Sequence, residues 1–398
     1  MMTGEGDAKP DRRKMASPNS ALIGLAGSRG RLTTPALVLD LDRLERNIAA
    51  MAACCRQTGL ALRPHAKTHK SVAIARLQIE AGAIGVSCAT LGEAEVMVGG
   101  GISGVLVTSP VIGEARVRRL IDLNKRATGL MAVVDHPQNL AELAAAAHAA
   151  VRSGAPPLSL LVDFDIGLHR TGAASIEDAL FLARGIAAEP ERELRFAGVQ
   201  AYAGQLQHVA DYAEREKLAR LQHARLGELV AALRAAGLAP AAITGAGTGT
   251  HDIDSRDAPF TELQAGSYVF MDVDYDRVQL RPGANRPPFE NALFVQTSVV
   301  SANASGFVTT DAGLKRFATD GPKPVIAAGA PAGATYRYQG DEHGAVVFAE
   351  ANQTLPLGAV VACVVPHCDP TVNLYDWYHC VRGDRLVDIW PVDARGAV

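Results

Sequence analysis

The most informative stretch of this chain is Leu62-Arg63-Pro64-His65-Ala66-Lys67-Thr68-His69-Lys70. It follows a short apolar segment, 59–62, that has the character of a strand, and it precedes a helix-like stretch, 72–81. In parallel α/β folds, side chains at this strand-to-helix edge carry the chemistry. Lys67 can form a Schiff base with a carbonyl group there, if its surroundings lower its pKa. The alternative is a solvated basic turn.

Strand-like and helix-like segments alternate from residue 34 to about residue 276. The expected strands, each followed by a helix or loop, are 36–39, 59–62, 84–88, 104–108, 131–135, 158–164, 196–200 and 242–244. About eight β–α pairs in series predict a (β/α)8 barrel. The alternative is an open doubly wound sheet, but G-x-G-x-x-G is missing near the first strand. Asp42 is expected to cap the first helix, whose apolar face is Leu44, Ile48 and Met51.

The sequence pattern changes after Pro282, where a proline- and glycine-rich segment indicates a linker or turn. Beyond it, short β-rich runs dominate and predict a smaller antiparallel β domain. We therefore expect three parts: a flexible leader at 1–30, the barrel at 31–280, and the β domain at 281–398.

The composition is that of an ordinary globular protein of 398 residues, with 48% hydrophobic and 20% charged residues. A net charge of -3 gives no electrostatic reason to expect nucleic acid or an anionic membrane as a partner. The six cysteines are scattered and form no C-x-x-C pair, which suits a reducing cytoplasm. No apolar run reaches the length of a transmembrane helix.

His65, two residues before Lys67, is a second candidate for the site. Residues two apart on an extended strand share a face, so His65 and Lys67 are expected to point into the barrel mouth together. The alternative is that His65 only packs at the end of its strand.

A glycine-rich loop follows the last expected barrel strand, in the run Thr244-Gly245-Ala246-Gly247-Thr248-Gly249-Thr250. Alternating glycines let backbone N–H groups converge on a phosphate, and threonine hydroxyls add donors. Barrels often bind phosphate near their seventh and eighth strands. The alternative is a tight loop without a ligand.

His367-Cys368-Asp369 is a candidate divalent-metal site in the β domain. On an extended chain, His367 and Asp369 share one side and Cys368 faces away, and the donor pair suits Mn²⁺, Zn²⁺ or Mg²⁺. A further group could come from the turn at 341–344. The alternative is a turn in which Asp369 stabilises the proline bend after it.

Other strand ends carry groups that suit an anionic or flat cofactor. Arg170 could contact an anionic oxygen, or could instead form a salt bridge with Asp163 or Asp165. Tyr202 and the run Gly266-Ser267-Tyr268 occupy equivalent positions, where a tyrosine can contact a cofactor or close the core edge.

Several motifs occur together in a fixed order. They are Arg63-Pro64-His65-Ala66-Lys67-Thr68-His69-Lys70, Thr248-Gly249, Glu262-Leu263-Gln264-Ala265-Gly266-Ser267-Tyr268, Asp341-Glu342-His343-Gly344 and His367-Cys368-Asp369-Pro370-Thr371. This set resembles the metal-dependent pyridoxal-phosphate family of D-threonine aldolase and D-serine dehydratase, the alanine-racemase-like fold-type III group. The resemblance runs from Thr33 to Gly396.

The resemblance implies a (β/α)8 barrel that binds pyridoxal 5'-phosphate, a C-terminal β domain, and a homodimer with active sites near the interface. It implies that Lys67 is the Schiff-base lysine, that Arg170 lies near the phenolic oxygen of the cofactor, and that the loop at Thr248 and Gly249 holds its phosphate.

The same resemblance implies that His367 and Asp369 hold a divalent metal, Mn²⁺ first, with Mg²⁺, Zn²⁺ or Co²⁺ as alternatives. Dehydratases of this family carry a His-x-Cys pair, whereas aldolases of D-3-hydroxy amino acids carry His-x-Asp, as this chain does. The stretch at 376–378 looks more like the 3-hydroxy-D-aspartate aldolases. One departure leaves the substrate open: Cys88-Ala89-Thr90 stands where many aldolases have Cys-Gln-Lys.

The expected reaction is retro-aldol cleavage of a D-3-hydroxy amino acid into glycine and an aldehyde. The cofactor on Lys67 would stabilise the carbanion, the metal would lower the pKa of the β-hydroxyl group, and His65 or a metal-bound water would take its proton. The alternatives are β-elimination by a D-serine or 3-hydroxyaspartate dehydratase, an amino-acid racemase, and a non-enzymatic pyridoxal-phosphate carrier. We expect a small-molecule substrate.

Overall fold

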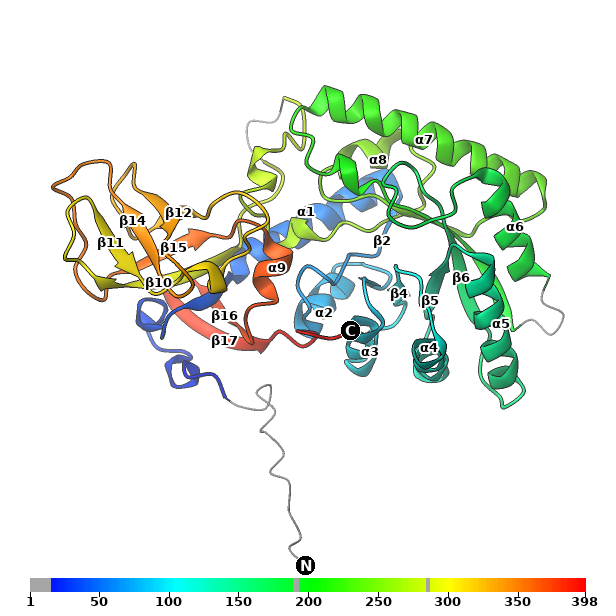
Figure 1. Ribbon diagram of the computed structural model, residues 1–398, viewed down its shortest axis with the longest axis horizontal. Helices are drawn as coiled ribbons and strands as arrows, with labels where there is room; N and C mark the ends of the chain where they lie inside the picture. The colour runs from blue at the N-terminus through cyan, green and yellow to red at the C-terminus, as the bar shows by residue number, and fades with distance from the viewer. Residues whose placement is uncertain (1–15, 189–192, 284–286) are drawn as a thin grey trace, which may run out of the picture.

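The computed structural model describes residues 16–188, 193–283 and 287–398, which form two sheets with helices around one of them (Figure 1). Eight parallel strands, neighbours in the order β2-β9-β8-β7-β6-β5-β4-β3, build the first sheet. They are β2 (Ala61–Leu62), β3 (Ser87–Cys88), β4 (Leu106–Val107), β5 (Met131–Val134), β6 (Leu158–Asp163), β7 (Leu194–Ala201), β8 (Ala242–Gly245) and β9 (Glu262–Leu263). A parallel bridge between His65 and Ser87 joins the two ends of this sheet. The predicted (β/α)8 barrel is confirmed.

Helices alternate with the barrel strands and cover the outside of the sheet (Figure 1). They are α1 (Leu41–Thr58), α2 (Val72–Glu80), α3 (Leu91–Gly99), α4 (Glu114–Arg126), α5 (Pro137–Val151), α6 (Ile176–Ala187), α7 (Tyr212–Ala235) and α8 (His251–Asp257). Every residue of β6 is buried, because a parallel strand is covered on both faces. The cap of α1 is Asp40, which accepts a hydrogen bond from the Arg43 amide, so the prediction of Asp42 as the cap is wrong.

The second sheet has nine strands and forms the predicted antiparallel β domain. Its strands are β1 (Ala36–Asp40), β10 (Leu293–Ser301), β11 (Phe307–Thr310), β12 (Val325–Ala328), β13 (Thr335–Tyr338), β14 (Gly344–Val347), β15 (Val360–Val364), β16 (Trp377–Arg382) and β17 (Arg385–Pro391). The short helix α9 (Cys368–Val372) connects β15 to β16 and lies at the junction with the barrel (Figure 1).

The first predicted barrel strand, 36–39, belongs to this second sheet instead. β1 pairs antiparallel with β10 and parallel with β16, so the segment 31–280 is not one continuous barrel domain. The eighth barrel strand is β9, which has only two residues. A short, fully apolar strand looks the same in either sheet, and a two-residue strand is too short to show a period.

The part of the predicted leader that the structure describes is folded. Short 3₁₀ turns at Ser20–Leu22 and Ser28–Arg31 lie against the β domain. The Asn19 side chain contacts His379 Nε2 at 2.9 Å, and Ser28 Oγ accepts a hydrogen bond from the Leu386 amide. The prediction of flexibility is therefore wrong for residues 16–30, and residues 1–15 lie outside the described residues. Within the described chain, no helix combines the length and apolarity needed to cross a membrane.

Candidate active site

A pocket of about 460 Å³ lies at the carboxyl ends of the barrel strands, where α9 of the β domain meets them. It is the edge at which the sequence places the chemistry. The pocket is lined by His65, Lys67, Thr68, Ala89, Thr108, Ser109, Leu168, Arg170, Gln200, Tyr202, Gly204, His208, Gly247, Thr248, Gln264, Gly266, Ser267, Tyr275, His367 and Asp369.

Lys67 and Asp369 meet in this pocket, although they are about 300 residues apart in the sequence. Lys67 Nζ lies 2.7 Å from Asp369 Oδ2, and the lysine side chain is 43% exposed while the aspartate is 13% exposed. The Asp369 carboxylate raises the pKa of Lys67 above its ordinary value. Burial works to raise the pKa of Asp369, but the Lys67 ammonium outweighs it and holds that pKa below its usual range. The Schiff-base hypothesis requires a lowered pKa of Lys67, whereas beside Asp369 that pKa is raised.

His65 lies in the pocket beside Lys67, as expected from their spacing. Its Nε2 lies 3.2 Å from Thr108 Oγ1, and the Thr108 hydroxyl donates to the Cys88 carbonyl. Nε2–H must therefore donate to Thr108, and Nδ1 accepts a long hydrogen bond from the Lys67 amide. Burial, and then the Lys67 charge, lower the pKa of His65 to about 3. Both ring nitrogens are engaged, which makes His65 a poor proton acceptor.

The glycine-rich loop between β8 and α8 presents Gly247 and Thr248 to the pocket. Gly249 is turned away, because its amide donates to Gln207 Oε1 at 2.9 Å. Thr248 Oγ1 accepts from the Tyr268 amide, whereas the Thr248 amide itself has no hydrogen-bond partner among the described residues. A buried backbone N–H without a partner, at the mouth of a barrel, can donate a hydrogen bond to a phosphate oxygen.

The strand-end run after β9 is divided between pocket and core. Gly266 and Ser267 line the pocket, and a Cβ on Gly266 would lie 2.6 Å from Thr68 Oγ1. Tyr268 does not line it: its fully buried ring packs against Phe289, and its hydroxyl accepts from Gln78 Nε2 at 3.0 Å. The Tyr268 side chain thus faces the core, the second of the two roles that the sequence leaves open for it, and its amide contacts the glycine-rich loop at Thr248.

Arg170 extends over the ring of Tyr202, with 5.9 Å from its guanidinium carbon to the ring centre. The alternative salt bridges are not made. Asp163 accepts instead from Gln200 and Thr171, and Asp165 pairs with the His169 ring at 2.7 Å. Arg170 thus keeps a charge available to an anionic group in the pocket.

The His367–Asp369 pair lies at the start of α9 and not on an extended strand. Both side chains still line the pocket, while Cys368 is fully buried and its amide donates to Asp272 Oδ2 at 2.8 Å. His367 Nδ1 lies 2.9 Å from Asp320 Oδ2. One imidazole and one carboxylate beside an open pocket fit a divalent cation that keeps water or substrate as its other ligands.

The turn at 341–344 does not supply a third metal ligand. Lys315 binds both Asp341 and Glu342 there, in a loop outside the pocket. Over residues 16–188, 193–283 and 287–398, no three histidine, cysteine, aspartate or glutamate side chains gather around one point. Among the described residues, His367 and Asp369 are therefore the two candidate protein ligands at this site.

His208 is the functional candidate that the sequence interpretation missed. It lines the pocket, its Nδ1 lies 3.2 Å from Asp274 Oδ2, and its ring is 4.6 Å from that of Tyr275. Burial lowers the pKa of His208. Its position in the loop after β7, at the same barrel edge as Lys67, is a signal that could have found it.

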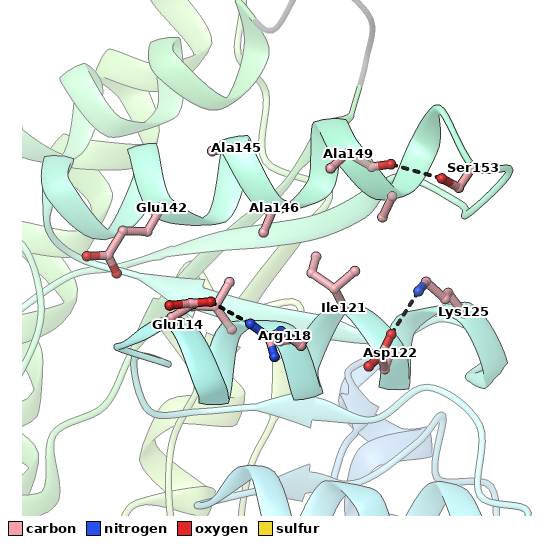
Figure 2. Close-up of a pocket in the computed structure, with 12 residues that line it drawn as sticks. Glu114, Arg118, Ile121, Asp122, Lys125, Glu142, Ala145, Ala146, Ala149 and Ser153 are labelled. Atoms are coloured by element: carbon pink, nitrogen blue, oxygen red, sulfur yellow. Dashed lines mark hydrogen bonds and ion pairs between the residues drawn. The ribbon is translucent and has the colours of Figure 1, made fainter.

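A second hollow, of about 610 Å³, lies on the outside of the barrel between α4 and α5 (Figure 2). Four of its charged groups form two pairs, Arg118 with Glu114 and Lys125 with Asp122. The facing helix contributes small side chains such as Ala146. None of the residues predicted to be functional lines it, and we therefore assign the chemistry to the pocket at the barrel mouth.

Comparisons with known proteins agree with this architecture. Residues 39–274 match the family described as alanine racemase, N-terminal domain, and residues 292–381 match the putative serine dehydratase domain. The chain is 39% identical to 3-hydroxy-D-aspartate aldolase of Paracoccus denitrificans (strain Pd 1222) over 379 residues, covering 94% of this chain and 95% of the relative. It is 41% identical to D-threonine aldolase of Arthrobacter sp over 371 residues, covering 92% and 93%. The crystal structure of D-threonine aldolase from Filomicrobium marinum superposes with a TM-score of 0.86 at 39% identity, covering 93% and 97%.

Proposed function

Because this chain belongs to the family of D-threonine aldolase and 3-hydroxy-D-aspartate aldolase, we propose that it is a lyase that cleaves D-3-hydroxy-α-amino acids into glycine and an aldehyde. The observation that carries the proposal is the meeting of Lys67 and Asp369 at 2.7 Å. An amine from the barrel and a carboxylate from the β domain there face the same substrate-sized pocket. A protein that only carries pyridoxal phosphate would need the lysine amine but not the Asp369 carboxylate.

The family implies pyridoxal 5'-phosphate, and the pocket fits it. When bound, this cofactor supplies an electron sink for the carbanion left by Cα–Cβ cleavage. Lys67 would hold its aldehyde carbon, and Arg170, over Tyr202, would bind its phenolic oxygen. The Thr248 amide, with Gly247, Gly266 and Ser267 around it, would bind its phosphate.

We also propose that His367 and Asp369 hold a divalent cation, with Mn²⁺ as the first candidate. Such an ion supplies a Lewis acid that lowers the pKa of the substrate's β-hydroxyl group. The aspartate in this pair suits a hard cation, and the His-x-Asp pattern resembles that of the family's aldolases rather than the His-x-Cys pattern of its dehydratases, which supports aldol cleavage over elimination.

His208 is the residue best placed to take the β-hydroxyl proton. Its Nδ1 lies 3.2 Å from Asp274 Oδ2, a contact that favours a hydrogen on Nδ1 and leaves the lone pair on Nε2. Burial lowers the pKa of His208, which favours the neutral ring that a base requires. We therefore place His208 in the role that the sequence interpretation gave to His65, whose nitrogens are both engaged.

The test supplies the purified protein with pyridoxal phosphate and Mn²⁺ and then adds D-threonine, D-phenylserine, 3-hydroxy-D-aspartate or D-serine. Glycine and an aldehyde should form in equal amounts from a D-3-hydroxy amino acid. Ammonia without glycine would show a dehydratase, and chelator-insensitive racemisation of alanine would show a racemase. Either result would overturn the proposal.

We further propose a cytoplasmic homodimer. All six cysteines are free in the structure, and five of them are buried, which suits a reducing compartment. Sedimentation of the holoenzyme measures the assembly, and a monomer at micromolar concentration would refute that part.

A further inference from the structure

Asp320 stands next to the metal-binding candidate His367 without being part of the pocket wall. Its Oδ2 lies 2.9 Å from His367 Nδ1, and its side chain is 54% exposed. It comes from the loop between β11 and β12, far in sequence from α9. An ionised carboxylate can only accept a hydrogen bond, so Nδ1 must carry the hydrogen, and the ring's lone pair is on Nε2.

We propose that Asp320 is a positioning residue for the metal site. It holds His367 in the Nδ1–H form and in one ring orientation, with Nε2 as the nitrogen that binds a divalent cation. This inference rests on the proposed role of His367 and Asp369. Metal-ligating histidines generally donate their second ring N–H to a carboxylate or carbonyl, which fixes the tautomer and makes the ligand more basic.

Geometry separates this role from that of a third ligand. A metal ion lies about 2.0–2.1 Å from the histidine nitrogen that binds it. The two ring nitrogens lie on different edges of the imidazole, and Asp320 occupies the Nδ1 edge. An ion on Nε2 is therefore beyond the reach of Asp320, in accord with the lack of a three-residue cluster in the described ranges.

The backbone around His367 leaves the ring orientation to Asp320. The His367 carbonyl accepts from Thr371 Oγ1 at 2.7 Å, and the Cys368 amide donates to Asp272. These bonds fix the main chain at the start of α9, but they do not fix rotation of the imidazole. Among the residues that the structure describes, the polar partner of the ring is Asp320. Loss of that carboxylate should thus free the ring without moving the helix.

The experiment measures metal affinity rather than turnover. Protein loaded with pyridoxal phosphate is stripped with a chelator and titrated with Mn²⁺ by calorimetry, as wild type, Asp320→Asn and Asp320→Ala. We expect the dissociation constant to rise about 10- to 100-fold in the alanine variant. The asparagine variant keeps a neutral hydrogen-bond acceptor, so its dissociation constant for Mn²⁺ should lie between those of the wild type and of Asp320→Ala. The visible spectrum of bound Co²⁺ should also change in both variants.

Two reference variants keep the outcomes distinct. Asp341→Asn removes a similarly exposed carboxylate from the same domain, one that contacts Lys315, and should leave Mn²⁺ affinity unchanged. His367→Ala should nearly abolish binding. If His367→Ala binds like wild type, the proposed metal site itself is wrong. If His367→Ala loses binding while both Asp320 variants stay within twofold of wild type, only the role of Asp320 is overturned.

Discussion

Removing one partner of the buried ion pair Arg63–Glu262 should destabilise the barrel by about 3–5 kcal/mol. Arg63 lies just after β2, in the motif that carries the reactive lysine, and Glu262 begins β9 on the neighbouring strand. Arg63 Nε and Nη2 donate to the two carboxylate oxygens, both at 2.9 Å. The side chains are only 6% and 4% exposed.

The magnitude follows from this burial. Glu262→Gln keeps the shape but removes the negative charge, which leaves the Arg63 guanidinium buried beside a neutral amide and the Gly104 carbonyl. At 1.4 kcal/mol per factor of ten, the expected loss raises the unfolded fraction about 100- to 4000-fold. Glu290→Gln is the matched control, because Arg46 and Glu290 form the same two-bond pair on the surface, 56% and 47% exposed. It should cost about 0.2–1 kcal/mol.

Urea unfolding with two probes measures this difference. Far-UV circular dichroism reports mainly on the barrel, which carries α2–α8, whereas Trp377 and Trp390 both lie in the β domain and report on it by fluorescence. If the free energies of unfolding of Glu262→Gln and the exposed control differ by less than about 1 kcal/mol, burial does not make the Arg63–Glu262 pair more costly to break. A second check is Arg63→Met with Glu262→Leu, which should recover most of the loss, since no charge is left buried.

Further predictions concern the pocket. Lys67→Ala should abolish the borohydride-fixable cofactor absorbance and all turnover. Gly266→Ala should weaken cofactor binding in equilibrium dialysis, because its Cβ would lie 2.6 Å from Thr68 Oγ1. His208→Asn should lower kcat about 100-fold or more with little change in KM, which steady-state kinetics would show. Burial raises the pKa of Asp163 to about 6, so folding favours its protonated form. Wild type should therefore lose thermal stability relative to Asp163→Asn as the pH rises from about 4 through 6, and melting curves at pH 5 and 7.5 would detect it.

The sequence predicted well those features that local patterns encode. The alternation of strands and helices predicted the barrel, and the motif around Lys67 and the His-x-Asp pair marked two parts of the pocket. Side-chain direction was less predictable. Gly249 and Tyr268 sit in the right loops but turn toward Gln207 and the core, because tertiary packing decides which way each one faces.

The site residues that sequence reasoning missed act through partners distant in the chain. The position of His208 after β7 could have marked it, but its partner Asp274 lies far along the chain, and so does Asp320 from His367. Neither pair has a sequence spacing that would reveal it, since each is formed by two loops that the fold brings together.

Strand β1, which was predicted for the barrel but belongs to the β domain, helps to explain how the barrel half and the β-domain half of the pocket stay in register. The chain enters the β domain first, as β1 between β10 and β16, and then passes directly into α1 and the Lys67 turn. It returns to the β domain only after the barrel is complete, and α9 leads straight into β16. β1 thus pairs with the strand that follows the metal-binding candidates, so Lys67 and Asp369 are both connected to one strand pair over short lengths of chain. A shift of the β domain relative to the barrel would have to break the hydrogen bond from the Tyr378 hydroxyl on β16 to the His69 carbonyl, or the hydrogen bond from the Cys368 amide to Asp272. That arrangement accounts for how a pocket built from two sheets can hold an amine and a carboxylate 2.7 Å apart.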